Sequence, residues 1–202
     1  MECINAQNCS KQKLYNLNDI ITCPFTTENK RLSELLEYFL YLAPNTTSVH
    51  SPKIENCNNL HDEIYRQMLE GRNFKLGIEF WTQQPKIDQR LADLSLHNEN
   101  ICLKCQRGVC KKKISKISPA ETNLCCLLRH IRNSIAHGRV YYVNNKSNNM
   151  FIMFEDAEPG QQNKSSSNHP IITARTVCLK ADLEHWRTVL MTYVANSKLI
   201  HT

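Results

Sequence analysis

The sequence lacks several features that would assign it at once to a large functional class. It contains no glycine-rich phosphate loop and no G-x-S-x-G element, which excludes P-loop nucleotide hydrolases and serine hydrolases with a nucleophile elbow. No segment repeats along the chain, so a solenoid is excluded as well. The longest uncharged apolar stretch, Tyr38 to Ala43, is far too short to span a bilayer.

The first residues also lack the pattern of a secretory leader, because Met1 to Ser10 has no cationic start followed by an apolar run. Ten cysteines would suggest a disulfide scaffold in a short secreted chain. Without such a leader, a reducing cytoplasm and free thiols are the better interpretation. We therefore expect a cytoplasmic protein with no membrane partner, in which Cys125 and Cys126 are small core residues of a helix.

The composition is that of one globular domain with polar loops. A chain of 202 residues can bury a proper hydrophobic core, and no change in composition compels a second domain. Hydrophobic content of 41% and charged content of 22% lie a little below the usual values. Lysine and arginine exceed aspartate and glutamate by 25 to 19, and this net charge of +6 suits a polyanionic partner without demonstrating one.

The hydrophobic spacing of the first half is mostly helical. It predicts a first helix with a wide apolar stripe, which begins at about Asn29 and ends at Pro44. A second helix is predicted to begin at Asn58 or Asn59 and to end near Gly71. The remaining assignments are an irregular arm over 1–27, a segment over 74–81 that is ambiguous between helix and strand, and a helix from Pro85 that Asn98 ends.

Residues 98–118 form the most basic part of the chain and are predicted to be a loop. Between Ile101 and Ala120 there are six cations and no acid. One interpretation is a solvated surface connector, and the other is a cradle for a phosphate backbone, whose binding would weaken steeply with salt.

Three cysteines in the same loop, Cys102, Cys105 and Cys110, have the spacing C-x2-C-x4-C, with His97 upstream of them. Thiolates on a turn can converge on one zinc ion. Only one C-x-x-C pair is present and the second half of a four-ligand site is irregular, so we expect no metal and no cofactor. A zinc-stabilised interaction protein stays open as a third interpretation.

A long helix is predicted over 118–137. Ser118 has the position of an N-cap, Pro119 suits the first helical turn, and Glu121 can close a capping box. On a wheel of about 100° per residue, one arc is apolar and the other polar. The apolar arc contains Leu124, Leu127, Leu128, Ile131 and Ile135, and the polar arc contains Cys126, Arg129, His130, Arg132, Asn133, Ala136 and His137.

Gly138 suits the left-handed position that ends a helix, and the period then changes to two. We expect β elements over 139–179, with a hairpin and a third strand from Ile171. A closing helix follows over 181–197, with Leu183, Trp186, Leu190 and Tyr193 on one face.

The segment R-N-S-I-A-H-G-R-V-Y-Y, from Arg132 to Tyr142, closely resembles the HEPN family (higher eukaryotes and prokaryotes nucleotide-binding domains), whose signature is R-N-x-x-x-H near a helix end. The following strands and the L-K-A-D-L-E-H-W helix resemble a plasmid-borne prokaryotic branch of that family. The resemblance is specific over 118–194 and only compatible upstream. It implies a mainly α fold: one HEPN-like helical bundle with a small three-stranded β insertion before the C-terminal helix.

The resemblance further implies a metal-independent RNA endonuclease of a toxin, defence or RNA-maturation system. Its catalytic residues would be Arg132, Asn133 and His137. Histidine suits a base for the 2′-OH and arginine a charge for the phosphorane. We also take Arg129, His130 and Arg139 as candidate substrate contacts. A leaving-group acid is not obvious within one chain, so we expect a homodimer through the motif helix, with RNA as a partner and an antitoxin as a further candidate partner.

Two alternatives remain open from the sequence. Arginine and histidine in the last turn of a helix are favoured by the macrodipole alone, so helix termination by itself can account for their positions. The chain is otherwise interpretable as a non-catalytic HEPN-like module that binds RNA, a nucleotide or a regulatory protein partner. Salt-sensitive RNA binding without cleavage would favour this module.

Overall fold

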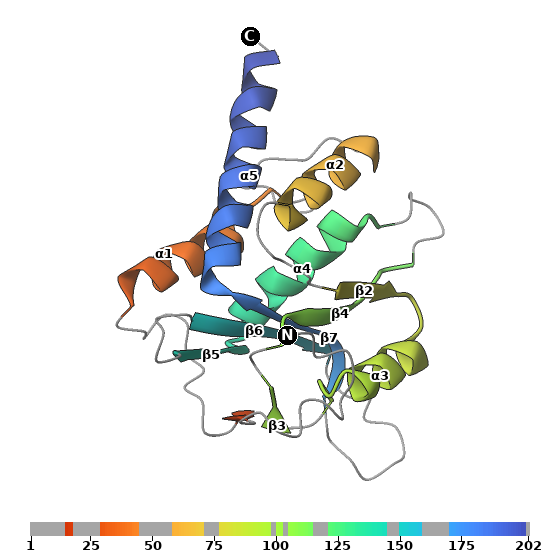
Figure 1. Ribbon diagram of the computed structural model, residues 1–202. Helices are drawn as coiled ribbons and strands as arrows, with labels where there is room; N and C mark the ends of the chain where they lie inside the picture. The colour runs from red at the N-terminus through yellow and green to blue at the C-terminus, as the bar shows by residue number, and fades with distance from the viewer. Residues whose placement is uncertain are drawn as a thin grey trace.

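A computed structural model describes residues 15–17, 29–44, 58–70, 77–97, 100–102, 105–114, 121–144, 150–158 and 170–200. Of the arm predicted over 1–27, only 15–17 lie in the described part. The described helices are α1 (Lys30–Glu37), α2 (Asn58–Leu69), α3 (Gln84–Asp93), α4 (Asn123–Ala136) and α5 (Lys180–Ile200), and a π-helical turn, η3 (Tyr38–Leu42), continues α1 (Figure 1). The strands are β1 (Tyr15–Asn16), β2 (Gly77–Trp81), β3 (Asn100–Ile101), β4 (Arg107–Lys111), β5 (Val140–Asn144), β6 (Met150–Glu158) and β7 (Ile171–Leu179).

Five strands form one mixed sheet in the order β2-β4-β7-β6-β5, and β1 pairs with β3 in a separate ribbon. β2 and β4 are parallel, whereas the other neighbours in the sheet are antiparallel. The expected mainly α bundle with a small three-stranded insertion is therefore wrong, and the fold is mixed α/β. The error came from β2 and β4, two short strands without clear alternation that pair only because α3 returns the chain beside β2.

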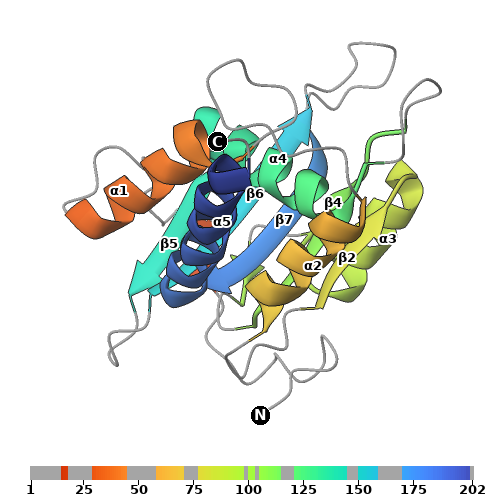
Figure 2. The same cartoon turned by 90° about the horizontal axis from the view of Figure 1, so that it is seen from above.

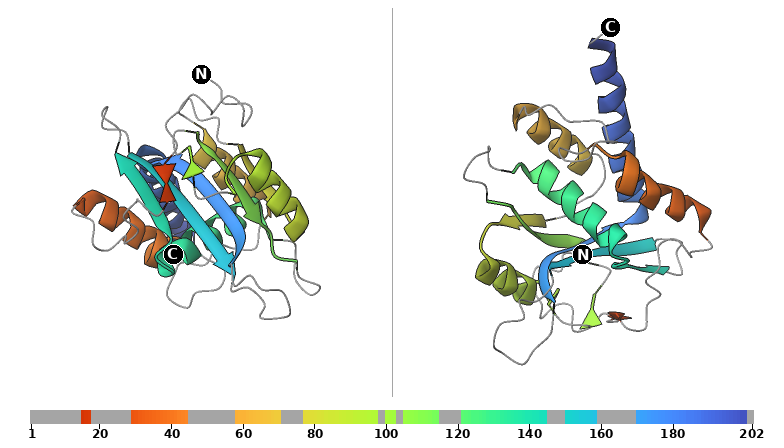
Figure 3. Two further views of the ribbon diagram at one scale, coloured as in Figure 1. Left: turned by 90° about the horizontal axis from the view of Figure 1, so that it is seen from below. Right: turned by 180° about the vertical axis from the view of Figure 1, so that it is seen from behind.

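Helices cover both faces of this sheet. Seen from above, α1, α2, α4 and α5 lie over one face (Figure 2), and α3 lies on the other face, as the view from below shows (Figure 3). The first face buries one large cluster that includes the fully buried Trp186 of α5 together with Phe154 and the apolar residues of α4. The second face buries a smaller cluster around Ile87 and Leu91 of α3. The helix that carries the R-N-x-x-x-H motif is thus packed between the sheet and other helices.

The interior strand β4 corrects the prediction of a loop over 98–118. Arg107 to Cys110 are buried between β2 and β7, and the described residues 112–114 lie beyond the end of the strand. A Cβ on Gly108 would lie 2.8 Å from Oγ1 of Thr176 on β7, so the strands approach closely because this residue is glycine. The strand was not predicted because the segment contains six cations. The tendency to form a strand depends on burial and packing against neighbouring strands more than on composition.

The motif helix is shorter than predicted. α4 begins at Asn123 with Thr122 as its N-cap, whose side chain accepts a hydrogen bond from the backbone N–H of Cys125. Glu121 does not close a capping box, because its carboxylate binds Arg129, and Ser118 lies outside the described residues.

Other expected elements are confirmed. The first helix has Asn29 as its N-cap, α2 spans Asn58–Leu69, and Pro85 lies in the first turn of α3. α3 ends at Asp93, before the predicted Asn98. β5 and β6 form the predicted hairpin, β7 is the third strand, and α5 closes the chain. No helix in the described part of the chain is long and apolar enough to cross a membrane.

Candidate active site at the end of the motif helix

The predicted apolar stripe of α4 is confirmed, but its polar face is not an open surface. Leu124, Leu127, Leu128, Ile131 and Ile135 are all buried. Cys126, His130 and Ser134 are buried as well, because the helix lies across the sheet with α2 and η3 beside it (Figure 3). In the helix itself only Ala136 is exposed, and the capping residue His137 is exposed beside it. Helical periodicity places the polar residues together, but it does not show that Cys126 and His130 among them are buried.

A carboxylate on β6, Asp156, is the centre of the polar contacts below α4. Its Oδ2 atom lies 2.7 Å from Nδ1 of His130 and accepts a hydrogen bond of 2.9 Å from Nδ2 of Asn133. Its backbone carbonyl accepts a hydrogen bond from the hydroxyl of Thr173 on β7. Asn133 is therefore oriented by Asp156.

His130, expected from the sequence to be a surface substrate contact, is 2% exposed. Its second ring nitrogen, Nε2, lies 2.8 Å from the backbone carbonyl oxygen of Lys111. Both nitrogens thus face acceptors, and both can donate only when the ring is an imidazolium. Burial raises the pKa of Asp156, but the hydrogen bond and charge of His130, with Asn133 and Arg129, outweigh this effect and hold that pKa below its ordinary value.

Arg129 is held by a second acid. Its Nε and Nη2 atoms donate to the two carboxylate oxygens of Glu121 at 2.7 and 2.8 Å, and Nη2 also donates to the carbonyl of Lys111. Burial raises the pKa of Glu121, but Arg129 and the backbone N–H of Lys113 lower it more. The end of β4 is therefore tied to the middle of α4 by the side chains of Arg129 and His130.

These two acids should make the fold sensitive to acid. The pKa values of Asp156 and Glu121 lie below their ordinary values of 3.8 and 4.5 in the fold. Their contribution to stability is complete above those ordinary values and is lost as the pH falls through the lowered ones. We expect urea unfolding from neutral pH to about pH 3 to show this loss. An Asp156→Asn variant should lose less stability over the same range, and an equal loss would contradict the assignment.

Arg132 joins the motif to the first helix. Its Nε atom donates to the carbonyl oxygen of Leu40, in the π-helical turn, at 2.9 Å. Burial lowers the pKa of Arg132, although a guanidinium stays charged at any pH the fold survives. The two residues after Leu40, Tyr41 and Leu42, are each 58% exposed. The structure thus places a fixed arginine next to an exposed apolar pair.

His137 caps the C-terminus of α4. Its backbone N–H donates to the carbonyl of Asn133, and Gly138 follows with φ +66, the left-handed conformation that the sequence predicted for it. The imidazole is exposed, one turn beyond Asn133. Of the three residues predicted to be catalytic, His137 is open to solvent, Arg132 is half-buried, and Asn133 is bound to Asp156.

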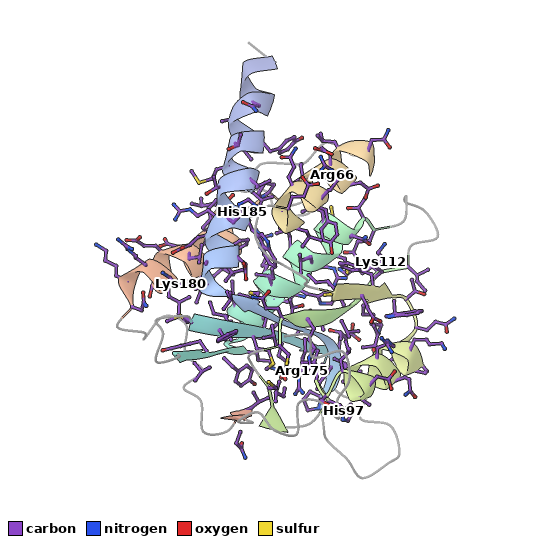
Figure 4. All side chains as sticks on the ribbon, viewed as in Figure 1. Arg66, His97, Lys112, Arg175, Lys180 and His185 are labelled. Carbon is purple, nitrogen blue, oxygen red and sulfur yellow. The ribbon has the colours of Figure 1, made fainter. Side chains whose placement is uncertain are left out.

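Arg139 does not share a site with Arg129 or His130. Its Nη1 atom lies 3.8 Å from Oε1 of Glu155, whose carboxylate also binds Arg175 at 2.7 Å. Glu155 and Asp156 are neighbours on β6, so their side chains point to opposite faces of the sheet. Arg139 therefore belongs to an ion-pair group on the α3 face, with Arg175 visible below the sheet in Figure 4.

The cysteine cluster does not converge on a metal. Cys102 and Cys105 lie together, with 3.4 Å between their sulfur atoms, whereas Cys110 is buried on β4 with its sulfur 3.6 Å from the hydroxyl of Thr176. Across the described ranges, no group of three or more His, Cys, Asp or Glu side chains could hold an ion. The zinc-stabilised interpretation therefore loses its proposed ligand set.

The sequence did not predict that Asp156 binds His130 and Asn133. It also did not predict that the backbone carbonyls of Lys111 and Leu40 bind side chains of α4. The motif lies along one helix, and a strand residue that supports it gives no signal in helical periodicity. The segment E-D-A-E, from Glu155 to Glu158, does contain one signal that could have indicated this role. Two adjacent acids at the end of an otherwise apolar strand need cationic partners if they are buried.

Comparison with known protein families agrees with the motif. A sequence profile of the family described as HEPN pEK499 p136 matches residues 4–195, nearly the whole chain. Comparisons with curated proteins and with solved structures gave no match. The family match extends well upstream of the segment on which the sequence resemblance was specific. The chain therefore belongs to the HEPN pEK499 p136 family.

Proposed function

We propose that this HEPN protein is a metal-independent RNA endonuclease whose site is completed by a second copy of the chain. The observation that carries the proposal is the exposed His137 at the end of α4, five residues after an Arg132 that is fixed by the carbonyl of Leu40. In the cleavage step, His137 removes the proton of the 2′-OH, and that oxygen attacks phosphorus. Arg132 stabilises the charged phosphorane, and the 5′-oxygen leaves with a proton, giving a 2′,3′-cyclic phosphate.

A second copy supplies what one chain lacks. The leaving oxygen needs an acid, and the other histidine of α4 does not offer one, because His130 is buried between Asp156 and Lys111. Two α4 ends related by a two-fold axis bring two His137 side chains to one phosphate, one as base and one as acid.

The surface around the motif suits such an interface. Tyr41 and Leu42 are among the few large apolar side chains exposed in the described residues, and they follow the carbonyl that holds Arg132. Ala136 is exposed and small, so helix ends can approach closely there. An apolar rim beside a cationic site is the arrangement expected for a shared active site between copies.

The function is tested by incubating the purified protein with RNA in excess chelator. We expect cleavage, and products that end in a 2′,3′-cyclic phosphate, which a phosphatase cannot remove unless acid first opens the ring. Cleavage that requires an added divalent metal ion would overturn the proposal.

The composite site predicts that dimerisation and cleavage are lost together. In a Tyr41→Glu/Leu42→Glu variant, like charges would meet across the two-fold axis, so the dimer dissociation constant should rise by roughly a hundredfold or more. Analytical ultracentrifugation measures the association, and RNA cleavage is assayed at the same concentrations. Met191→Glu is the matched control, because Met191 is 49% exposed on α5. A double variant that is monomeric and fully active would contradict a shared site.

A second candidate is a non-catalytic module that binds RNA. It is favoured by the use of Asn133 for structure, since the amide is bound to Asp156 and does not orient His137. RNA binding that weakens with salt, with no cleavage by the dimer, would select this function.

A further inference from the structure

A second basic site lies beside the motif, at one end of the sheet. β2, β4 and β6 run in the same direction, so their carboxyl ends meet at this end together with the start of β7. The structure contains a pocket of about 320 Å³ there. Its lining includes Lys111, Lys112 and Lys113 from the end of β4, Arg129 and His130 from α4, and Glu158 from the end of β6.

The charge of this pocket is positive. Three lysines and Arg129 give four cations at neutral pH, and Glu158 in the lining and Glu121 behind Arg129 give two carboxylates. Two positive charges remain. The buried His130–Asp156 pair leaves this sum unchanged if the ring is protonated and lowers it by one if the ring is neutral, so the pocket is positive in either case. Of the two acids, Glu158 is 62% exposed and lies 3.9 Å from Lys111, an ion pair that solvent weakens. The pocket therefore attracts anions.

Two of its cations are held in place by the fold. The Nε and Nη2 atoms of Arg129 are bound to Glu121 and to the carbonyl of Lys111, and within the described residues Nη1 has no hydrogen-bond partner. Lys112 is anchored at both ends, because its backbone N–H donates to the carbonyl of Trp81 and its Nζ lies 5.7 Å from the centre of the Phe80 ring. Donors that are already oriented lose little entropy when a ligand binds.

The pocket and His137 lie on the same side of α4, whereas Arg132 faces η3. His130 and His137 are seven residues apart, which is two helical turns, or roughly 10 Å along the axis. Because seven residues complete almost two full turns, both side chains leave the helix in nearly the same direction. A single RNA strand whose phosphate lies at His137 can reach the pocket a few nucleotides further along.

We propose that this pocket binds a phosphate group of the RNA strand that passes the end of α4. The inference rests on the proposed function for its substrate class, but binding can be measured whether or not cleavage occurs. Lys112 and Lys113 supply charge at the mouth, and Arg129 supplies an oriented donor inside. The pocket fixes the position of the strand, and the Arg132–His137 pair acts on a neighbouring phosphodiester.

The test uses the full chain with His137→Ala, so that bound RNA is not cleaved, and adds Lys112→Gln/Lys113→Gln. Binding of a fluorescently labelled single-stranded RNA is followed by anisotropy over a range of salt concentrations. We expect roughly tenfold weaker binding at low salt, and a log–log salt slope that is smaller by about 0.7 for each phosphate that the protein no longer neutralises. Lys113 is exposed and Lys112 loses only its contact with the Phe80 ring, so the melting temperature should fall by no more than about 4 °C.

The matched control is Lys30→Gln/Lys180→Gln, which removes the same charge from the start of α1 and the start of α5. Lys180 lies on the opposite side of the molecule from Lys112 (Figure 4). The proposal requires this control to bind RNA within about twofold of the parent at each salt concentration. Equal weakening in both double variants would overturn the pocket and leave a general effect of net charge.

Competition separates the possible sources of the phosphate. Inorganic phosphate and adenosine monophosphate are titrated against the labelled RNA. A strand site is supported if RNA binds much more tightly than either competitor and if this difference in affinity is abolished in Lys112→Gln/Lys113→Gln. Mononucleotide binding that depends on these lysines while RNA binding does not would overturn it. Cleavage by the wild-type chain, measured separately, reports on the proposed function alone.

Discussion

Replacing His137 by alanine should remove RNA cleavage and leave the fold intact. A general base or acid contributes roughly a hundredfold to ten-thousandfold to a rate, and in a symmetric dimer the substitution removes both. Cleavage should therefore fall by at least about a thousandfold in single-turnover assays in chelator. Because the imidazole is exposed, its loss should change the free energy of unfolding by no more than about 0.5 kcal/mol.

His97→Ala is the matched control, since His97 is also an exposed histidine, located beyond the end of α3. It should cleave RNA at the wild-type rate. Arg132→Ala should also be inactive, but it frees the carbonyl of Leu40, so its unfolding must be measured alongside. If His137→Ala retained wild-type cleavage, the catalytic assignment would be wrong and helix capping would suffice to explain this histidine.

Asp156→Ala should be the most destabilising single change in the site. The substitution removes the partner of His130 and of Asn133, and leaves Nδ1 of the buried His130 ring without the carboxylate that it contacts. Breaking a buried ion pair from one side costs about 3–5 kcal/mol, so denaturant unfolding should show a loss of that size. RNA cleavage should also fall, because α4 would no longer be fixed to β6 near its catalytic end.

Glu158→Ala tests whether the loss belongs to the buried pair. Glu158 is two residues further along β6, and its exposed carboxylate lies 3.9 Å from Nζ of Lys111. Its replacement should cost less than about 1 kcal/mol. A His130→Ala/Asp156→Ala double variant should lose less stability than the two single variants added together, because the partners act as a unit. Additive losses would show that the two residues do not interact.

Local sequence signals predicted the elements whose hydrophobic period is strong. The apolar stripe of α4, the left-handed Gly138 and the β5–β6 hairpin all follow from residues close together in the chain. Trp186 and Leu190, at helical spacing, are buried as expected. In each case one pattern, extending over a few turns or one strand, was sufficient.

The pairing of the strands was not available from such patterns. Arg107 and Lys111 look like loop residues until β2 and β7 lie on either side of them. The burial of His130 depends in the same way on Asp156, which lies on another element. The sequence therefore placed the motif residues together at one helix end. Which of them are buried in structural contacts and which are exposed depends on contacts between segments that are distant in the chain.

The order of strands in the sheet has a consequence for how the chain acquires its fold. β5, β6 and β7 are neighbours both in the chain and in the sheet, so they can pair as soon as they exist. β4 is made much earlier, yet one of its edges stays open until β7 arrives. Pairings across such long separations form slowly. In a growing chain that has not reached β7, the strands on the two sides of β7 are therefore not yet joined into one sheet. The basic pocket is incomplete, and α4 cannot yet pack on the full sheet.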